Sequence, residues 1–269
     1  MAAQSSSKAA LVTAQRHELA VYAVSAIVFT TAAGITWYSS RSMSGGMPMA
    51  GGWTMSMAWM PMGAWMESGM MFAGMWVAMM IAMMLPSTLP ILLLYRRAAR
   101  FRGETRTGLL STLMATGYFG VWAVFGIIAY LAGLGIALLA MKSGAFSRAV
   151  PIASGVALVA AGIYQVTPWK AACLRHCRDP LSLVAGHMQS GWRGALRLGV
   201  HHGAFCAACC WALMLIQLAL GVMNLLVMIA VALVIALEKL VSRGLLVARF
   251  TGVLAMAGGL VIAGRALMA

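Results

Sequence analysis

Charged residues are scarce in this 269-residue sequence, and acidic residues are nearly absent, since Asp and Glu together number five. Charged side chains make up 9% of the chain, whereas a soluble domain typically has about a quarter of its residues charged. The mean hydropathy is +0.91, and 62% of the residues are hydrophobic. A chain with so little charge cannot cover a water-facing surface, so the composition excludes an ordinary soluble protein.

The sequence also lacks the motifs of several common enzyme classes. It contains no phosphate-binding loop, no dinucleotide fingerprint and no nucleophile elbow. Five acidic residues leave little room for catalysis by paired carboxylates. Among them, Glu238 lies at the end of an apolar run, where we expect a boundary ion pair with Lys239 or Arg243. These absences favour a binding or transport protein over an enzyme and leave the latter open.

Long apolar runs, by contrast, fill most of the chain. A run of roughly 20 apolar residues crosses a bilayer as a helix, because lipid offers no partner to a free backbone group. The sequence therefore predicts an all-α, polytopic transmembrane bundle over residues 19–269, after a polar N-terminal tail at residues 1–18. About seven runs qualify as spans: Leu19–Tyr38, Met70–Tyr95, Leu109–Met141, Val150–Val166, Gly199–Leu220, Asn224–Leu240 and Leu245–Ala263.

The first run has a rival interpretation as a cleaved signal peptide. Its apolar stretch continues past small residues to Trp37 and Tyr38, which suit a membrane interface. We therefore expect an uncleaved anchor.

The basic residues predict the orientation of these spans. With seven spans, four basic residues lie on one side of the membrane and the remaining 15 of the 19 lie on the other. Because positive charges accumulate on the cytoplasmic side, the N-terminus is expected inside and the C-terminus outside. The net charge of +14 is thus explained by short membrane loops, and no nucleic-acid partner is expected. The four outer residues are Arg41, Lys142, Arg148 and Arg265.

A methionine-rich segment, residues 41–68, separates the first two spans on the predicted outer side. It contains three Met-x-Met pairs: Met47 with Met49, Met55 with Met57, and Met60 with Met62. Thioethers are soft ligands that select Cu(I), and unlike paired thiols they remain usable in an oxidising compartment. Alternatively, the methionines are apolar filler in a loop that tryptophans hold on the membrane surface.

Methionines continue into the second predicted span. Met71, Met75, Met79 and Met83 step by four residues and share one helical face, with Met84 beside them. We single out Met79, Met83 and Met84 as candidate ligands, although a methionine stripe is also ordinary packing. Pro86 and Pro90 then each remove a backbone hydrogen bond, which Ser87 and Thr88 are expected to compensate in part.

All five cysteines lie in the C-terminal half, toward the predicted cytoplasmic side. Cys206, Cys209 and Cys210 fall at positions i, i+3 and i+4, so that on a helix their thiols face one way. Cys173 and Cys177 are one turn apart if their segment is helical. Thiols stay reduced in the cytoplasm and bind Cu(I) well, and Zn(II) is a possible alternative. The remaining candidate ligands are His201 and His202.

These two groups of sulfur ligands are expected to approach each other within the membrane. Met83 and Met84 lie roughly 20 Å inward from Met70, and Cys209 and Cys210 lie roughly 15 Å inward from the opposite side. In a hydrocarbon core of ~30 Å the two depths nearly meet. If the second and fifth spans pack together, thioethers lead from the outer side to the inner thiols.

Several motifs of this chain resemble a bacterial family of predicted metal-binding integral membrane proteins, known otherwise as a domain of unknown function. The resemblance covers the second to the sixth predicted span and implies a helical membrane fold that binds metal, but it implies no reaction. Residues 41–68 lie outside it. The matching stretches are AMMLPS at Ala82–Ser87, YQ-x-TP-x-K-x-x-CL-x-x-C at Tyr164–Cys177, CxxCCW at Cys206–Trp211, LM-x-x-Q-x-x-x-GVMN at Leu213–Asn224 and EK at Glu238–Lys239.

Together these features predict a multi-pass protein of the bacterial inner membrane that handles Cu(I), with capture by the outer methionines and transfer to the inner cysteines. One alternative is an accessory subunit that assembles or stabilises a metal centre in a larger membrane complex. Another is a membrane thiol–disulfide oxidoreductase. Besides lipid and metal, the expected partners are such a complex or further copies of the chain, through small residues of the last span, Gly258, Gly259 and Gly264.

Overall fold

The computed structural model of the protein describes residues 2–43, 45–60 and 65–268, with side chains described for residues 18–43, 45–60 and 66–268. Helices dominate this part of the chain, which confirms the predicted all-α class. The α-helices are α1 (Ala2–Ser42), α2 (Trp65–Phe101), α3 (Thr107–Lys142), α4 (Gly144–Val166), α5 (Pro168–Cys177), α6 (Pro180–His187), α7 (Gly191–Gly221), α8 (Leu225–Leu240) and α9 (Gly244–Met268).

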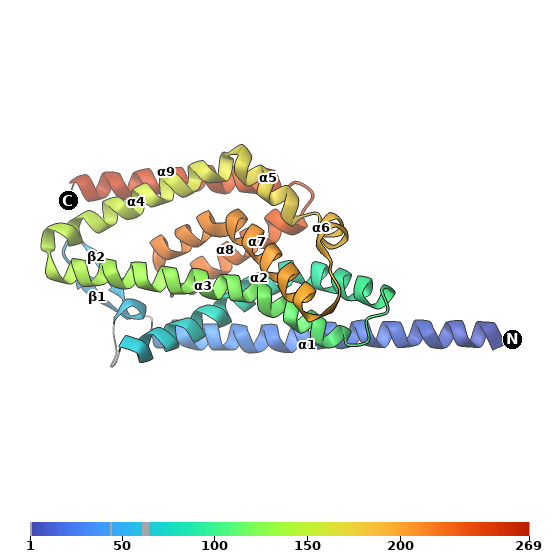
Figure 1. The fold of residues 1–269 in the computed structure, drawn as a ribbon. Helices are drawn as coiled ribbons and strands as arrows, with labels where there is room; N and C mark the ends of the chain where they lie inside the picture. Colours follow the sequence, from blue (N-terminus) through green and yellow to red (C-terminus); the bar gives the residue numbers. More distant parts are fainter. Residues whose placement is uncertain (1, 44, 61–64, 269) are drawn as a thin grey trace.

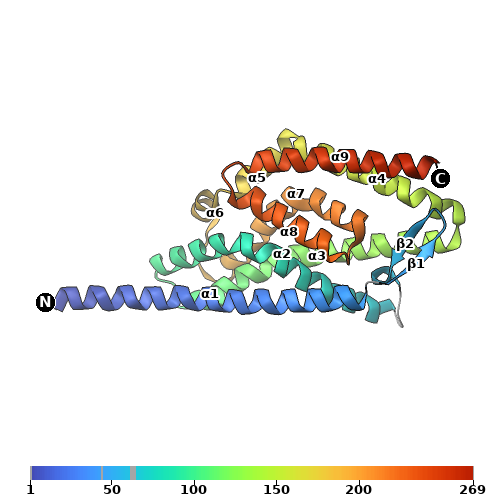
Figure 2. The same cartoon turned by 180° about the vertical axis from the view of Figure 1, so that it is seen from behind.

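Six of these helices, α1, α2, α3, α4, α7 and α9, are long and apolar enough to cross a membrane. The sixth predicted run forms α8, whose 16 residues make it the shortest of the seven, at ~24 Å for a rise of 1.5 Å per residue. It nevertheless runs back from the end of α7 toward the start of α9 (Figure 1). As a result, the start of α1 and the end of α9 lie at opposite ends of the bundle (Figures 1 and 2).

Helices α4 and α9 form a tight pair along one edge of the molecule, and α1 lies along the opposite edge (Figure 1). Glycines permit this close approach: a Cβ on Gly155 would lie 2.7 Å from the Gly259 oxygen, and one on Gly162 would lie 2.5 Å from the Gly252 oxygen. Gly259 thus serves a contact within the chain rather than the contact with a partner that we expected. Gly258 faces open space.

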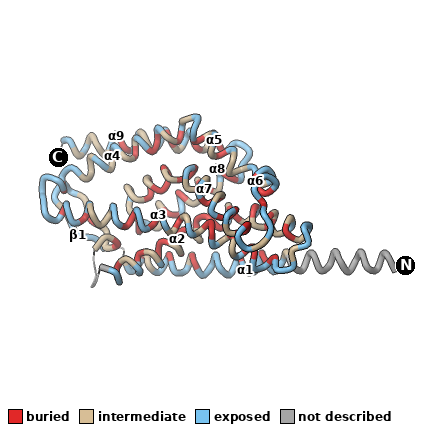
Figure 3. Tube along the Cα trace, in the orientation of Figure 1, coloured by how far each residue is buried: buried red, intermediate tan, exposed pale blue. Residues whose placement is uncertain are grey.

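The buried core lies between α2, α3, α7 and α8 (Figure 3). Two fully buried tryptophans from adjacent helices anchor it, and the Trp76 indole N–H donates to the Trp122 carbonyl at 2.9 Å. Helix α2 passes through this core unbroken despite Pro86 and Pro90. The hydroxyls of Ser87 and Thr88 both donate to the Met84 carbonyl rather than to the carbonyls that the prolines leave free.

Part of the methionine-rich segment folds as an antiparallel hairpin of β1 (Gly46–Met49) and β2 (Trp53–Ser56), followed by the 3₁₀ turn η1 (Met57–Trp59). Gly51 and Gly52 in its turn have positive φ angles, which glycine adopts without strain. The hairpin docks on the start of α4, because Trp53 donates to the Ser147 carbonyl at 3.0 Å and the Ser147 hydroxyl donates to the Ala50 carbonyl at 2.7 Å. It therefore caps the end of the bundle at which α9 ends (Figure 2).

Candidate metal site

The three cysteines of α7 all point into the core, and each has no exposed surface. Their spacing places them on one helical face, as the sequence predicts. Helix α5 brings the other two cysteines beside them, starting at Pro168 after its N-cap Thr167, whose hydroxyl accepts from the Lys170 amide. Cys173 and Cys177 are partly buried and pack against the same core. Two helices thus gather all five thiols in one region.

Within this region four thiols form one chain of contacts. The Cys209 side chain lies within hydrogen-bonding reach of both Cys177 and Cys210, and the Cys210 side chain also lies within reach of Cys206. All five cysteines are free thiols.

Cys206 has two further polar partners from other helices. The Lys239 ammonium donates to its sulfur at 2.9 Å, and the Tyr118 hydroxyl lies 2.9 Å from the same sulfur. Lys239 is 9% exposed, and among the described side chains no carboxylate lies within ion-pair distance of its ammonium. A buried charge is costly unless it is paired. The group nearest to this ammonium that can take a negative charge is therefore the Cys206 thiol.

A second buried lysine is fully paired. The Lys170 ammonium lies 2.6 Å from the Glu238 carboxylate and donates to the Cys209 carbonyl at 2.8 Å, and Gln165 donates to the same carboxylate at 2.9 Å. The predicted ion pair of Glu238 with Lys239 or Arg243 is thus wrong, because α5 brings Lys170 to this carboxylate. Burial by itself lowers the pKa of Lys170, but Cys209, Cys210 and Glu238 outweigh it and raise that pKa above its ordinary value.

The two candidate histidines occupy different surroundings. His202 is buried, and its ring stacks on Tyr118 with 5.2 Å between ring centroids. His201 lies outside the thiol region, stacked on His187 at 4.2 Å and near His176. Buried nitrogens of both candidates, Nδ1 of His202 and Nε2 of His201, lack a hydrogen-bond partner. Tyr118, which also contacts the Cys206 sulfur, therefore connects His202 to the thiols.

The candidate methionines of α2 are buried and belong to the same core as the α7 cysteines, together with Met214. We expected the second and fifth spans, now α2 and α7, to pack directly on each other. It is not such direct packing that brings these methionines and cysteines into one core. Helix α2 packs mainly on α1, α3 and α8, and α7 packs mainly on α3, α4, α5 and α8. Helices α3 and α8 each pack against both α2 and α7. These candidate methionines are Met79, Met83 and Met84.

The candidate methionines of the outer segment are spread over the hairpin and η1. Met47 pairs with Met55 across the two strands, and their environments are opposite, because Met47 is 40% exposed and Met55 is 1% exposed. Met49 is half-buried. Met57 and Met60 line a small pocket with three other methionines. Met62 lies outside the described residues.

Comparison with known proteins identifies a family that this chain matches. The family model described as "PpoB2: Copper chaperone" matches residues 73–262, which is more than half of the chain. The chain belongs to the PpoB2 copper chaperone family. The match contains all five cysteines and the buried methionines of α2, and it leaves out α1, the hairpin and η1. No curated protein and no solved structure matches the chain.

Within this PpoB2 chain, four thiols form a chain of contacts rather than a closed metal cage. Over residues 18–43, 45–60 and 66–268, no three His, Cys, Asp or Glu side chains are arranged to hold a metal ion.

Sequence reasoning missed two residues of the site. Tyr118 contacts the Cys206 sulfur from α3, and no local pattern in the sequence points to it. Lys170 lies in the TP-x-K-x-x-C run that carries the family resemblance, and a lysine between two apolar spans reads as a loop charge. Its zero exposure follows from α5, which folds back against α7.

Proposed function

We propose that this membrane protein binds Cu(I) as its cargo at the thiols of α5 and α7, and hands it on from there. The observation that carries the proposal is the Lys239 ammonium, which is buried against the Cys206 sulfur with no carboxylate to pair it among the described side chains. One Cu(I) held by two thiolates has a net charge of −1. A single ammonium neutralises that charge, and Lys170 cannot serve because Glu238 already pairs it.

Four contacting thiols offer the ligands. Cys206 with Cys210, Cys210 with Cys209, and Cys209 with Cys177 each provide two sulfurs that already contact each other. Two soft ligands suffice for Cu(I), and the low-dielectric core strengthens the attraction between the copper thiolates and Lys239. His202 is the additional ligand we propose at this site. Copper that binds there displaces thiol protons.

The source of the copper in this proposal is the outer end of the bundle. Thioethers of the outer segment capture Cu(I), and the buried methionines of α2 offer soft ligands along the way to the thiols. The continuous core that contains Met75, Met79, Met83 and Cys206 supports such a route. By the positive-inside argument, the route leads from the outside toward the cytoplasmic side of the bacterial inner membrane.

Family membership favours one form of this function over transport alone. Because the family is one of copper chaperones, we propose that the thiol site delivers its copper to a partner protein or to a metal centre of a larger membrane complex. Vesicles that contain only the purified protein separate the two forms. A transporter accumulates copper in such vesicles, whereas a chaperone retains the metal until an acceptor is added.

The direct test measures copper per chain by mass spectrometry in protein purified under reducing conditions and loaded with Cu(I). A variant with Cys206→Ser, Cys209→Ser and Cys210→Ser is compared with the parent, and a Cys173→Ser variant serves as a matched control at a thiol outside this chain of contacts. We expect the triple variant to lose the thiol-bound copper and the control to keep it. A parent that binds no copper after loading would disprove the proposed function.

A further inference from the structure

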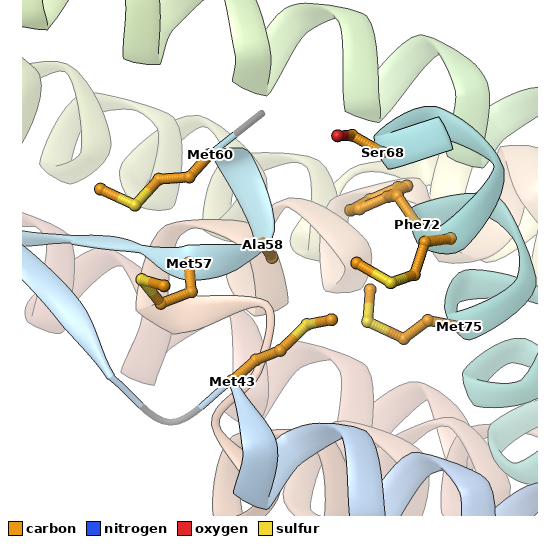
Figure 4. Close-up of a pocket in the computed structure, with 8 residues that line it drawn as sticks. Met43, Met57, Ala58, Met60, Ser68, Phe72 and Met75 are labelled. Atoms are coloured by element: carbon orange, nitrogen blue, oxygen red, sulfur yellow. The ribbon is translucent and has the colours of Figure 1, made fainter. Parts of the chain in front are cut away.

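Five methionines from three separate elements line one small pocket at the outer end of the bundle (Figure 4). Met43 follows the end of α1, Met57 and Met60 lie at η1, and Met71 and Met75 lie on the first turns of α2. Figure 4 shows the Met43 and Met75 side chains pointing toward each other across the pocket. Met43 is 28 positions or more from Met71 and Met75 in the sequence, so these residues meet only through folding. The Met-x-Met spacing does not predict that they line one pocket.

The remaining lining residues contribute no competing ligand. They are Ala58, Ser68 and Phe72, so the described part of the chain supplies neither a carboxylate nor an imidazole to the pocket. Hard divalent cations require oxygen ligands, and zinc sites are built from Cys, His and carboxylates. A pocket with only thioethers and one hydroxyl carries no negative charge to balance a divalent ion. Its chemistry selects a soft monovalent cation.

Aromatic packing holds the inner wall of the pocket in place. The Phe72 ring contacts Trp59 at 5.3 Å, Trp76 at 5.8 Å and Tyr130 at 4.9 Å between ring centroids. A cavity remains open in front of this wall, although methionine as an adaptable filler ordinarily closes such gaps. Met75 belongs both to the pocket and to the core that contains the α7 cysteines. Met75 thus connects the pocket to the core that contains the inner methionines.

We infer that this five-methionine pocket is a Cu(I) site, in which Met43, Met71 and Met75 supply the principal thioether ligands and η1 supplies the others. The inference deepens the proposed function, because it assumes that the protein handles copper, and it assigns capture to the pocket rather than to the Met-x-Met pairs of the hairpin. Because the ligands come from α1, η1 and α2, bound copper ties these three elements together.

The test replaces thioethers by isosteric side chains, since Met-to-Leu exchanges conserve volume and cost little stability. The pocket variant carries Met43→Leu, Met71→Leu and Met75→Leu. The control variant carries Met47→Leu, Met49→Leu and Met70→Leu, three nearby methionines that do not line the pocket. Cu(I), and Ag(I) as a redox-inert probe, are titrated in competition with a chromophoric chelator. We expect the pocket variant to lose one bound equivalent and the control to keep it.

The outcomes separate this inference from the proposed function. A control variant that loses the equivalent while the pocket variant keeps it would overturn the inference in favour of the hairpin. Equal binding by both variants and the parent would also overturn it, and would leave the thiol site standing. Loss in the pocket variant beside unchanged binding in the triple cysteine variant would support the pocket and disprove the thiol site.

A folding defect is distinguished from ligand loss in two ways. The apparent unfolding temperature of each variant in detergent is measured without metal, and the single Met75→Leu variant repeats the titration with the least change in packing. X-ray absorption on a copper-loaded variant in which all five cysteines are replaced by serine gives an independent readout. Sulfur-only coordination there supports the pocket, and coordination by nitrogen or oxygen overturns it.

Discussion

The two sulfur-rich ends of this protein differ in how their ligands are held and in what surrounds them. At the inner end, the buried thiols of α7 and the partly buried thiols of α5 lie among two lysines, a glutamate and a tyrosine. At the outer end, thioethers of three elements surround a pocket whose described lining residues include no charged side chain. Thiolates bring negative charge into a low-dielectric core and require cations nearby, whereas thioethers are neutral and require only packing.

This difference implies that the two ends respond differently to substitution and to pH. A polar network in the core is sensitive to the loss of any one member, because the partner left behind stays buried and unpaired. Thioethers in an apolar pocket tolerate exchange for leucine, because nothing is left unsatisfied. Thiols also bind protons in competition with copper, and thioethers do not.

The largest effect is expected from breaking the buried ion pair. Replacing Glu238→Gln leaves the Lys170 ammonium buried without a countercharge, and we expect a loss of about 3–5 kcal/mol in the free energy of unfolding. The apparent unfolding temperature in detergent measures it. Glu18→Gln, which breaks the exposed pair with Arg97, is the control and should have little effect. A double variant with Lys170→Met and Glu238→Leu should recover most of the loss, and failure to recover would point to a role beyond charge pairing.

The next effect is a pH dependence confined to one end. Copper that binds at the thiols displaces protons. As the pH is lowered, its apparent affinity should therefore fall by about tenfold per pH unit for each thiol proton displaced. The pocket methionines carry no proton to displace, so the affinity of that site should stay constant over the same range. Titrations from pH 8 to pH 6 on the pocket variant and on the triple cysteine variant measure each end alone. Equal slopes at both ends would contradict the comparison.

The sequence predicts the inner end better than the outer end. The reason is that the inner cysteines lie close together in the sequence, whereas the residues that meet at the outer end do not. The helical class, the span positions and the shared face of Cys206, Cys209 and Cys210 follow from periodicity and length, which are local properties. The helix at Cys173 and Cys177 follows from a Thr-Pro start signal. The inner cluster is therefore largely visible in the sequence because most of its ligands are neighbours on one helix.

The contacts that complete each end are not local, and the sequence does not reveal them. Tyr118 reaches Cys206 from α3, and Lys170 reaches Glu238 across 68 positions. At the outer end, the Met-x-Met spacing predicts ligand pairs within the loop, but the hairpin register separates an exposed Met47 from a buried Met55. Which methionines meet is decided by the docking of η1 against α2 and α3, which no periodicity encodes.

A smaller effect is expected from removing the unpaired ammonium. Lys239→Gln keeps a polar side chain but removes the positive charge beside the Cys206 sulfur, and a hydrogen bond to a charged group contributes about 1.5 kcal/mol or more. We expect Cu(I) affinity at the thiol site to fall about tenfold and affinity at the methionine pocket to stay unchanged. Lys142→Gln, at an exposed lysine at the end of α3, is the matched control. An unchanged affinity in the Lys239 variant would contradict the charge-balance argument.

The smallest effect separates hydrogen bonding from charge at the same sulfur. Tyr118→Phe removes the hydroxyl that lies 2.9 Å from the Cys206 sulfur and keeps the ring that stacks on His202. A neutral hydrogen bond contributes about 0.5–1.5 kcal/mol, so Cu(I) affinity at the thiol site should change by only a few-fold. Tyr130→Phe, whose ring packs on Phe72 at the outer end, is the counterpart and should alter neither site. If Tyr118→Phe lowered Cu(I) affinity at the thiol site as much as Lys239→Gln does, the charge of Lys239 would not be what distinguishes the inner end. The difference between the two ends would then rest on hydrogen bonds to the Cys206 sulfur alone.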